Sequence, residues 1–159
     1  MKIKAGTAIF TTLFIFLIGI AAASAFGIWS TVSSKVPVKF KDAAHAEAYN
    51  PADIRGSYTF ADISRLYEVP MSDLTSAFSL EAEDASRFKC KDLEARFKGG
   101  QYEIGTASVR MFVACYYGLP FSPTEETYLT DRAVKILEDQ GNLSDEQRKY
   151  LKTHTVPQP

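Results

Sequence analysis

The stretch IRGSYTFADISRLYEVPMSDL, residues 54–74, decides the fold class. Thr59 and Asp62 have the spacing of a helix start, where a hydroxyl accepts a hydrogen bond from an early backbone N–H and a carboxylate is favoured in the first turn. Apolar residues then recur at helical spacing, at Phe60, Ile63, Leu66 and Tyr67. Pro70 stops this helix, and a second one is expected over 72–79. The stretch therefore predicts two helices joined by a tight turn.

A second stretch matches the first at an offset of fifty residues. Residues 104–120 read IGTASVRMFVACYYGLP. The matched pairs are Ile54 with Ile104, Ile63 with Val113, Tyr67 with Tyr117, Val69 with Leu119 and Pro70 with Pro120. Five matches at one spacing predict a duplicated helix–turn–helix unit, at about 53–80 and 103–140. In the second unit Thr106 is the expected cap, and the inner stripe is Val109, Phe112, Val113 and Tyr116.

The rest of the chain is also predicted to be helical. Helices are expected over 42–49, 89–97, 123–140 and 145–153, the last one started by a cap at Ser144. No stretch alternates convincingly between apolar and polar residues, so strands are not expected and the fold class is all-α. The expected organisation is an anchor over 1–29, a linker with a lead-in segment over 30–52, a helical domain over 53–153 and a tail over 154–159.

The N-terminal part contains 23 residues without a charge, from Thr7 to Trp29. As a helix these residues span about 34 Å, enough for the roughly 30 Å hydrocarbon core of a bilayer. The residues expected to form the membrane anchor are Phe10, Phe14, Phe16, Leu17, Gly19, Ala23 and Trp29. Gly19 and Ala23 have the spacing of a close helix–helix contact in lipid, although an ordinary run of small residues gives the same pattern.

A cleaved signal peptide is the competing interpretation of this segment. Lys2 and Lys4 would form its basic start, and Ala23-Ser24-Ala25 is an acceptable cleavage site. The hydrophobic run continues past that site, so we expect a retained single-pass anchor in the cell (inner) membrane. Because a short N-terminus before one span suits a signal anchor, the helical domain is expected on the extracytoplasmic side.

The chain of 159 residues has a formal net charge of −1 that hides an asymmetry. Residues 1–41 contain five Lys and no acidic residue, whereas residues 42–159 contain 13 basic and all 19 acidic residues. The helical domain is therefore acidic and repels phosphate backbones, which argues against a nucleic-acid partner. The second helix of the first unit (72–79) also lacks Lys and Arg, so it cannot grip DNA as a recognition helix.

The sequence lacks the groupings that carry catalysis. His45 and His154 lie in the lead-in segment and the tail, where solvated positions are expected. There is no Cys-x-x-Cys-His haem motif and no Gly-rich phosphate loop, and two cysteines cannot hold an iron–sulfur cluster alone. We therefore predict no catalytic, cofactor-binding or metal-binding residue, and no small-molecule substrate.

The sequence leaves two alternatives open for the cysteines and two for a set of aromatic rings. Cys90 and Cys115 either pair as a disulfide, if the domain is extracytoplasmic, or remain separate thiols, with Cys115 buried. The expected partner-contact residues are Tyr67, Tyr116, Tyr117 and Phe121. The alternative for most of these rings is that they complete a small core.

The first stretch also resembles a known module. Ile54, Gly56, Thr59, Ile63, Tyr67, Val69, Pro70 and Leu74 fit a pattern associated with membrane-bound iron–sulfur and cytochrome b-type proteins of anaerobic respiration. The resemblance covers about residues 50–120 and implies a small helical module that accompanies a membrane electron-transfer complex. It carries over no catalytic or cofactor residue. The chain departs from those larger proteins because it lacks their Cys-rich clusters and haem-ligating transmembrane histidines.

Together these features predict a non-catalytic accessory subunit. Membrane lipid and other subunits of a membrane complex are its expected partners. The alternative is a membrane-tethered module that binds a peptide or a cell-envelope ligand. Exposure of the tyrosine rings tests this binding module, because rings fully buried in the domain's own core could not line a binding pocket.

Overall fold

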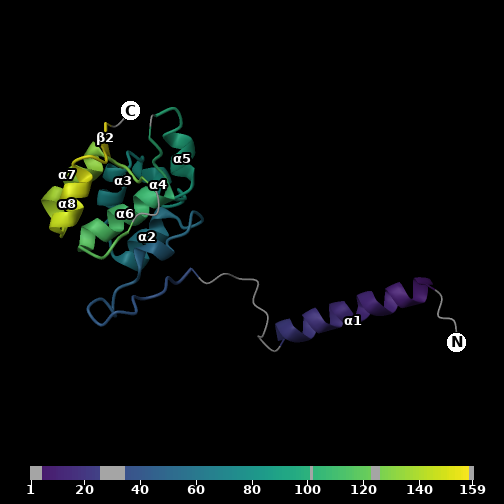
Figure 1. Cartoon of the computed structure of the whole chain (residues 1–159). Helices are drawn as coiled ribbons and strands as arrows, with labels where there is room; N and C mark the ends of the chain where they lie inside the picture. The colour runs from purple at the N-terminus through teal and green to yellow at the C-terminus, as the bar shows by residue number, and fades with distance from the viewer. Residues whose placement is uncertain (1–4, 26–34, 101, 123–125, 158–159) are drawn as a thin grey trace. The chain divides into compact units, whose positions relative to one another are not determined.

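The computed structural model describes residues 5–25, 35–100, 102–122 and 126–157. It divides into two units, at 1–34 and 35–159 (Figure 1). The first contains a single helix, α1 (Ala5–Ala25), and the second is a helical domain with its own core. The all-α prediction is confirmed, apart from two very short strands.

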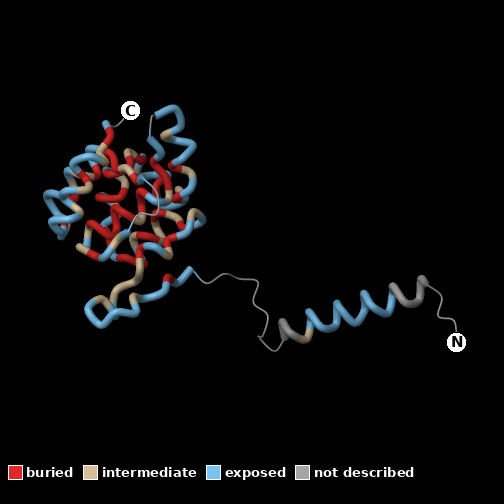
Figure 2. The backbone as a smooth tube through the Cα atoms, in the orientation of Figure 1, coloured by how far each residue is buried: buried red, intermediate tan, exposed pale blue. Residues whose placement is uncertain are grey.

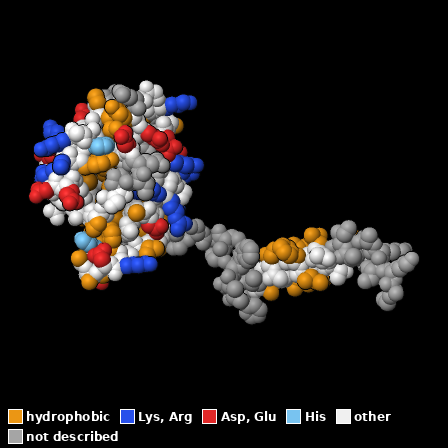
Figure 3. Space-filling view, viewed as in Figure 1, with side chains coloured by type: hydrophobic (Ala, Val, Ile, Leu, Met, Phe, Trp, Pro, Cys, Tyr) orange, Lys and Arg blue, Asp and Glu red, His pale blue; other side chains and the backbone are white. Residues whose placement is uncertain are grey.

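Helix α1 carries no charged residue, and its large apolar side chains are exposed (Figures 2 and 3). Phe10 and Phe16 are 77% and 69% exposed, and a Cβ on Gly19 would meet nothing within 4 Å. The side chains described in this helix are those of residues 10–22, so the side chain of Ala23 and the whole of Trp29 lie outside the described residues. Within the described part of the chain, no helix has the length and apolar character that a membrane crossing requires.

The domain begins with a lead-in segment that folds back on itself. Phe40 N–H donates to the carbonyl of Ala48, and Asn50 N–H donates to that of Val38. An antiparallel bridge between Lys39 and Tyr49 closes the loop. The short helix predicted over 42–49 is therefore wrong, because these backbone groups pair across the loop and not along a helix. We call residues 38–50 the lead-in hairpin.

Seven α-helices follow within the described residues of the domain, after one turn of 3-10 helix (η1, Pro51–Asp53). They are α2 (Phe60–Tyr67), α3 (Met71–Ala77), α4 (Ala82–Ala85), α5 (Asp92–Arg96), α6 (Thr106–Tyr117), α7 (Asp131–Gln140) and α8 (Asp145–Leu151). Strands β1 (Leu129–Thr130) and β2 (Thr155–Val156) form a two-stranded parallel sheet.

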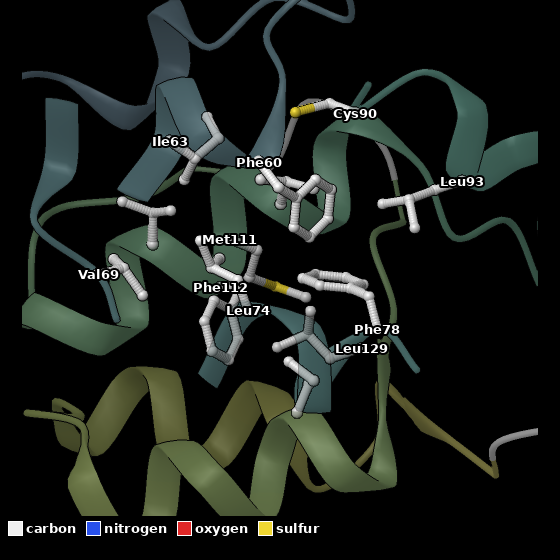
Figure 4. Packing of buried hydrophobic residues seen from close by; sticks show 14 of the residues in the cluster. Phe60, Ile63, Val69, Leu74, Phe78, Cys90, Leu93, Met111, Phe112 and Leu129 are labelled. Atoms are coloured by element: carbon white, nitrogen blue, oxygen red, sulfur yellow. The ribbon is translucent and has the colours of Figure 1, made fainter. Parts of the chain in front are cut away.

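The core lies around α6, which packs against α7 and η1, while α3 packs against α2 and α7. Edge-to-face ring contacts join Phe60 to Phe78 at 5.6 Å and Phe78 to Phe112 at 5.7 Å (Figure 4). The apolar face predicted for α2 is confirmed as buried, as are Leu74 and Phe78. Such ring pairs contribute about 0.5–1.5 kcal/mol each beyond the area that they bury.

The start of α2 shows why the chain is helical here. Thr59 Oγ1 accepts from the N–H of Asp62, and Asp62 Oδ2 accepts from the N–H of Thr59, so two helix-start donors are satisfied reciprocally. Ser144 and Gln147 repeat this capping box at α8. In α6, however, Gly105 and not Thr106 is the N-cap, and its N–H donates to Ser108 Oγ.

Several predicted boundaries are corrected by tertiary contacts. The helix predicted from 123 begins only at Asp131, because residues 129–130 form strand β1 beside β2. The helix predicted over 89–97 is limited to α5, because Lys89 pairs with Thr59 in an antiparallel bridge. Strands were not expected, but β1 and β2 pair in parallel. This pairing holds Thr155 and Val156 in the domain, so these two residues do not belong to a separate tail at 154–159.

The two matched stretches end their helices in the same way. Glu68 after α2 (φ 57°) and Gly118 after α6 (φ 63°) both adopt the left-handed conformation that ends a helix. Beyond this point they differ. Helix α3 starts directly after Pro70, whereas residues 121–122 and 126–128 form no helix. The duplication itself stays a prediction.

Candidate functional site

Two adjoining cavities share Leu119 as a wall, and we call them together the groove. The first, of about 400 Å³, is the tyrosine cavity, lined by Glu47, Ala48, Tyr49, Leu66, Tyr67, Glu68, Tyr117 and Leu119. The second, of about 440 Å³, is the apolar cavity. Its apolar wall consists of Met111, Cys115, Leu119, Pro120, Phe121, Tyr150 and Leu151, and its polar wall includes His45, Ser144, Glu146 and Gln147. The groove thus joins aromatic, aliphatic and acidic side chains.

The groove brings together three of the four residues predicted to contact a partner. Tyr67 and Tyr117 line the tyrosine cavity, and Phe121 lines the apolar one. Tyr67 is only 6% exposed and Tyr117 is 38% exposed, so the first ring forms the floor and the second is available to a ligand. Tyr116 lines neither cavity. Its hydroxyl donates to Asp73 Oδ2 at 2.8 Å, which makes it a packing residue between α6 and α3.

Three elements position the tyrosine cavity. The lead-in hairpin supplies Tyr49, which meets Tyr67 of α2 edge-to-face at 6.2 Å. The Tyr67 hydroxyl donates to the carbonyl of Asn50 at 3.1 Å, and this bond ties the hairpin to α2. The C-terminal end of α6 supplies Tyr117, and the left-handed turn at Gly118 then directs Leu119 to the shared wall.

The tyrosine cavity is acidic at its edge. Glu47 Oε2 accepts from Lys39 Nζ at 2.8 Å, and this contact raises the pKa of Lys39 and lowers that of Glu47. Burial, followed by the charge of Glu68, raises the pKa of Tyr117, so its hydroxyl is neutral at pH 7. Within the described residues Glu68 forms no ion pair. The cavity therefore presents neutral rings beside carboxylates.

In the structure the two cysteines are separate thiols, which is one of the two alternatives that the sequence left open for Cys90 and Cys115. Both side chains are buried, and burial raises the pKa of each thiol to about 12. A thiol held protonated in this way is a poor nucleophile. Cys115 lines the apolar cavity and contributes to it as a small apolar residue.

The histidines are not simply solvated, as the sequence suggested, because both are half-buried. His45 Nδ1 lies 2.8 Å from Asp42 Oδ1 and shapes the turn of the lead-in hairpin. The His154 ring stacks on Tyr150 at 3.7 Å and lies 5.1 Å from Tyr128, so it belongs to an aromatic stack next to β2. In the described part of the chain, no three metal-ligating side chains gather as a metal ion would require.

Sequence reasoning missed the acidic and hairpin residues of the groove. Tyr49 and Glu47 reach it only because the lead-in hairpin folds against α2, and no local pattern predicts that contact. One feature of the sequence could have drawn attention to Glu68. At the fifty-residue offset Glu68 matches Gly118, and at both residues a helix ends in the left-handed conformation. A glutamate in place of glycine there is uncommon.

A further cavity of about 510 Å³ lies between the segment after α5 and the C-terminal strand. Its lining includes Gly100 and Tyr102, which flank residue 101, and that residue is outside the described part of the chain. The groove is the better candidate because one hairpin, three helices and the segment after α6 converge on it and bring together three of the predicted contact residues.

Comparison with protein families, with curated proteins and with solved structures finds no match for this chain.

Proposed function

We propose that this chain is a non-catalytic, membrane-anchored accessory subunit whose groove docks a partner subunit. The observation that carries the proposal is the exposure of large apolar side chains along α1. A helix that is apolar on all sides requires an apolar environment, which lipid or another protein provides. The 23 uncharged residues from Thr7 to Trp29 favour lipid. The short N-terminus before this single span favours a helical domain on the extracytoplasmic side.

The groove supports the docking part of the proposal. It combines exposed aromatic surface at Tyr117 with aliphatic walls, and aromatic anchors contribute most of the binding energy in many interfaces. The thiol at Cys115 is protonated and poorly reactive, so binding suits the groove better than reaction. The resemblance to modules of anaerobic respiration makes a membrane electron-transfer complex the first place to look for the partner.

Anchoring is tested by replacing Leu17 with Arg. A charge at the middle of a span costs about 2.5–3.5 kcal/mol in insertion. We expect the parent chain to stay in the membrane pellet after carbonate extraction and the variant to be released in large part. Leu17→Ala serves as the control, because it shortens the same side chain without adding a charge. Equal release of the parent and the variant would reject the anchor.

Docking is tested by purifying the tagged chain in mild detergent and identifying what accompanies it by mass spectrometry. We expect a stoichiometric partner with the parent chain and its loss with Tyr117→Ala. Tyr102→Ala is the matched control, because Tyr102 is 39% exposed, like Tyr117, and lines neither cavity of the groove. A chain recovered alone, or equal recovery of the partner with both variants, counts against docking in the groove.

A membrane-tethered peptide-binding module is the second candidate, and the exposure of Tyr117 favours it. The same purification separates the two candidates. An accessory subunit recovers one folded partner in fixed proportion, whereas a peptide-binding module recovers segments of several proteins, or none, and still binds peptides in solution.

A further inference from the structure

The tyrosine cavity has the chemistry of a site for an organic cation. Its rings come from Tyr49, Tyr67 and Tyr117, and its carboxylates come from Glu47 and Glu68. None of the described side chains that line it is basic. A cation near the face of an aromatic ring gains about 0.5–1 kcal/mol at an exposed site and more when it is desolvated, and a nearby carboxylate adds to this attraction.

One cation of the chain already uses part of this chemistry. Lys39 Nζ lies 6.0 Å from the centroid of the Tyr49 ring and 2.8 Å from Glu47 Oε2. The pair is weakly held, because the side chain of Lys39 is 46% exposed and that of Glu47 is 97% exposed. Exposed ion pairs of this kind contribute about 0–1 kcal/mol, so a better-placed cation can replace Lys39.

The second carboxylate has no such internal partner. Glu68 is exposed and forms no ion pair among the described residues, and its charge acts on Tyr117. An incoming cation between Tyr117 and Glu68 would meet a ring and a carboxylate that the chain itself leaves unneutralised. Of the two carboxylates of the cavity, Glu47 is therefore paired with the chain's own lysine, whereas Glu68 has no ion pair among the described residues.

The shape of the groove indicates that the cation belongs to a polypeptide. The tyrosine cavity adjoins the apolar cavity at Leu119, and Met111, Phe121 and Leu151 form part of the apolar wall of that second cavity. A free cation would leave that second cavity empty. A segment with a basic residue next to apolar residues fills both cavities, and Glu146 at the apolar cavity adds a further negative charge.

We propose that the tyrosine cavity binds an arginine or lysine side chain of the partner protein, which displaces Lys39 from Glu47, while neighbouring apolar residues of the partner enter the apolar cavity. This proposal rests on the function proposed above and names the chemistry of the docking segment. Lys39 then acts as a competing internal cation. The affinity of the groove for the partner reflects the difference in binding free energy between the partner's cation and Lys39 at Glu47.

The test uses the full chain in an uncharged detergent, with 13C-labelled tyrosine rings observed by NMR. The probe is acetyl-Leu-Arg-Leu-Leu-amide, and its control is the same peptide with citrulline, which keeps the shape of arginine but carries no charge. We expect the arginine peptide to shift the ring signals of Tyr49 and Tyr117 and to bind at least fivefold more tightly than the citrulline peptide.

Variants of the chain then test each carboxylate and the competing lysine. Glu68→Gln should weaken binding of the arginine peptide by about two- to fivefold, the loss of one exposed charge contact. Lys39→Met keeps an unbranched apolar stem but removes the ammonium group and frees Glu47, so it should strengthen binding by a similar factor. Glu83→Gln on α4 makes the same charge change at an exposed residue outside the groove, and it should leave binding unchanged.

Three results would overturn the proposal: equal binding of the arginine and citrulline peptides, weaker binding with Lys39→Met, or tetramethylammonium binding as tightly as the peptide. Self-association of the chain that the peptide does not disperse would assign the groove to a second copy.

The proposed function fails separately, if the peptide binds as expected but Tyr117→Ala still recovers the partner. The present proposal fails alone if recovery needs Tyr117 but is indifferent to both Glu68→Gln and Lys39→Met.

Discussion

The Tyr116 hydroxyl of α6 donates a hydrogen bond of 2.8 Å to the Asp73 carboxylate of α3. Asp73 is buried at 8% exposure, and its carboxylate also accepts from Ser72 Oγ at 3.3 Å. Burial and the bond to Asp73 together raise the pKa of Tyr116 to about 12. The pair links the helix that leads into the groove with the helix that packs on α7.

Removal of that hydroxyl should destabilise the domain. Tyr116→Phe keeps the ring but leaves the Asp73 carboxylate short of a donor, at an expected cost of about 1–3 kcal/mol in the free energy of unfolding. Tyr102→Phe is the matched control, with an expected effect below about 0.5 kcal/mol. Chemical denaturation followed by circular dichroism measures both variants. Equal midpoints for the two variants would contradict a stabilising role for the bond.

Asp62 should make the domain sensitive to acid. Burial disfavours its charged form, but the hydrogen bonds from Lys35 (2.6 Å) and Thr59 outweigh burial and lower the pKa of Asp62 to about 2. The ordinary value is 3.8, so the stabilisation is complete above about pH 4 and is lost as the pH falls to 2. Asp62→Asn should cost about 1–2 kcal/mol at pH 7.

The control for that experiment is the exposed Asp139→Asn. Unfolding free energies of Asp62→Asn and the parent should converge between pH 4 and pH 2, whereas the Asp139 variant should follow the parent throughout. A constant difference between Asp62→Asn and the parent across this range would show that the carboxylate charge contributes nothing.

The buried hydroxyl of Thr130 should contribute through two hydrogen bonds. Its Oγ1 donates to the carbonyl of Ala77 at 2.6 Å and accepts from the N–H of Ala133 at 3.1 Å, so it caps α7 and joins it to α3. Thr130→Val has nearly the same shape but loses both bonds, at an expected cost of about 2–3 kcal/mol. Thr130→Ser keeps the hydroxyl and should lose only about 1 kcal/mol for the missing methyl group. Thermal melts that rank serine below valine would refute this assignment.

The thiols of Cys90 and Cys115 should be protected in the folded chain. Both are buried and protonated, so iodoacetamide at pH 8 should label neither within the time that it labels a free thiol in solution. After unfolding in guanidinium without reductant, mass spectrometry should show two added labels. A mature protein that accepts no label until it is reduced would contain the disulfide that the structure lacks.

The parts of the fold that could be predicted are those determined by neighbouring residues. The cap at Thr59, the cap at Ser144 and the apolar face of α2 depend on spacings within one or two helical turns, and all three are confirmed. The stripe expected on α6 is incomplete, because this helix is covered on several sides and buries Met111, Ala114 and Cys115 as well. A pattern that assumes one buried face cannot reveal a central helix.

The groove was predictable only in its aromatic half. Tyr67, Tyr117 and Phe121 attract attention as rings near helix ends, and the structure does bring them to one surface. Glu47 and Lys39 join the site through backbone pairing in the lead-in hairpin, which forms an isolated bridge and no regular strand. Long-range contacts of this kind leave no local periodicity to detect.

The backbone pairing between residues 56–60 and 88–91 has a consequence for the connectivity of the domain. Phe60 and Cys90 donate their N–H groups to the carbonyls of Phe88 and Tyr58, so these two segments lie side by side. The residues between them form a loop that this pairing closes. We therefore expect a chain cut after the exposed Glu81 to give two fragments that the pairing still holds together. The domain is thus a natural subject for fragment complementation, in which two separately produced pieces reassemble.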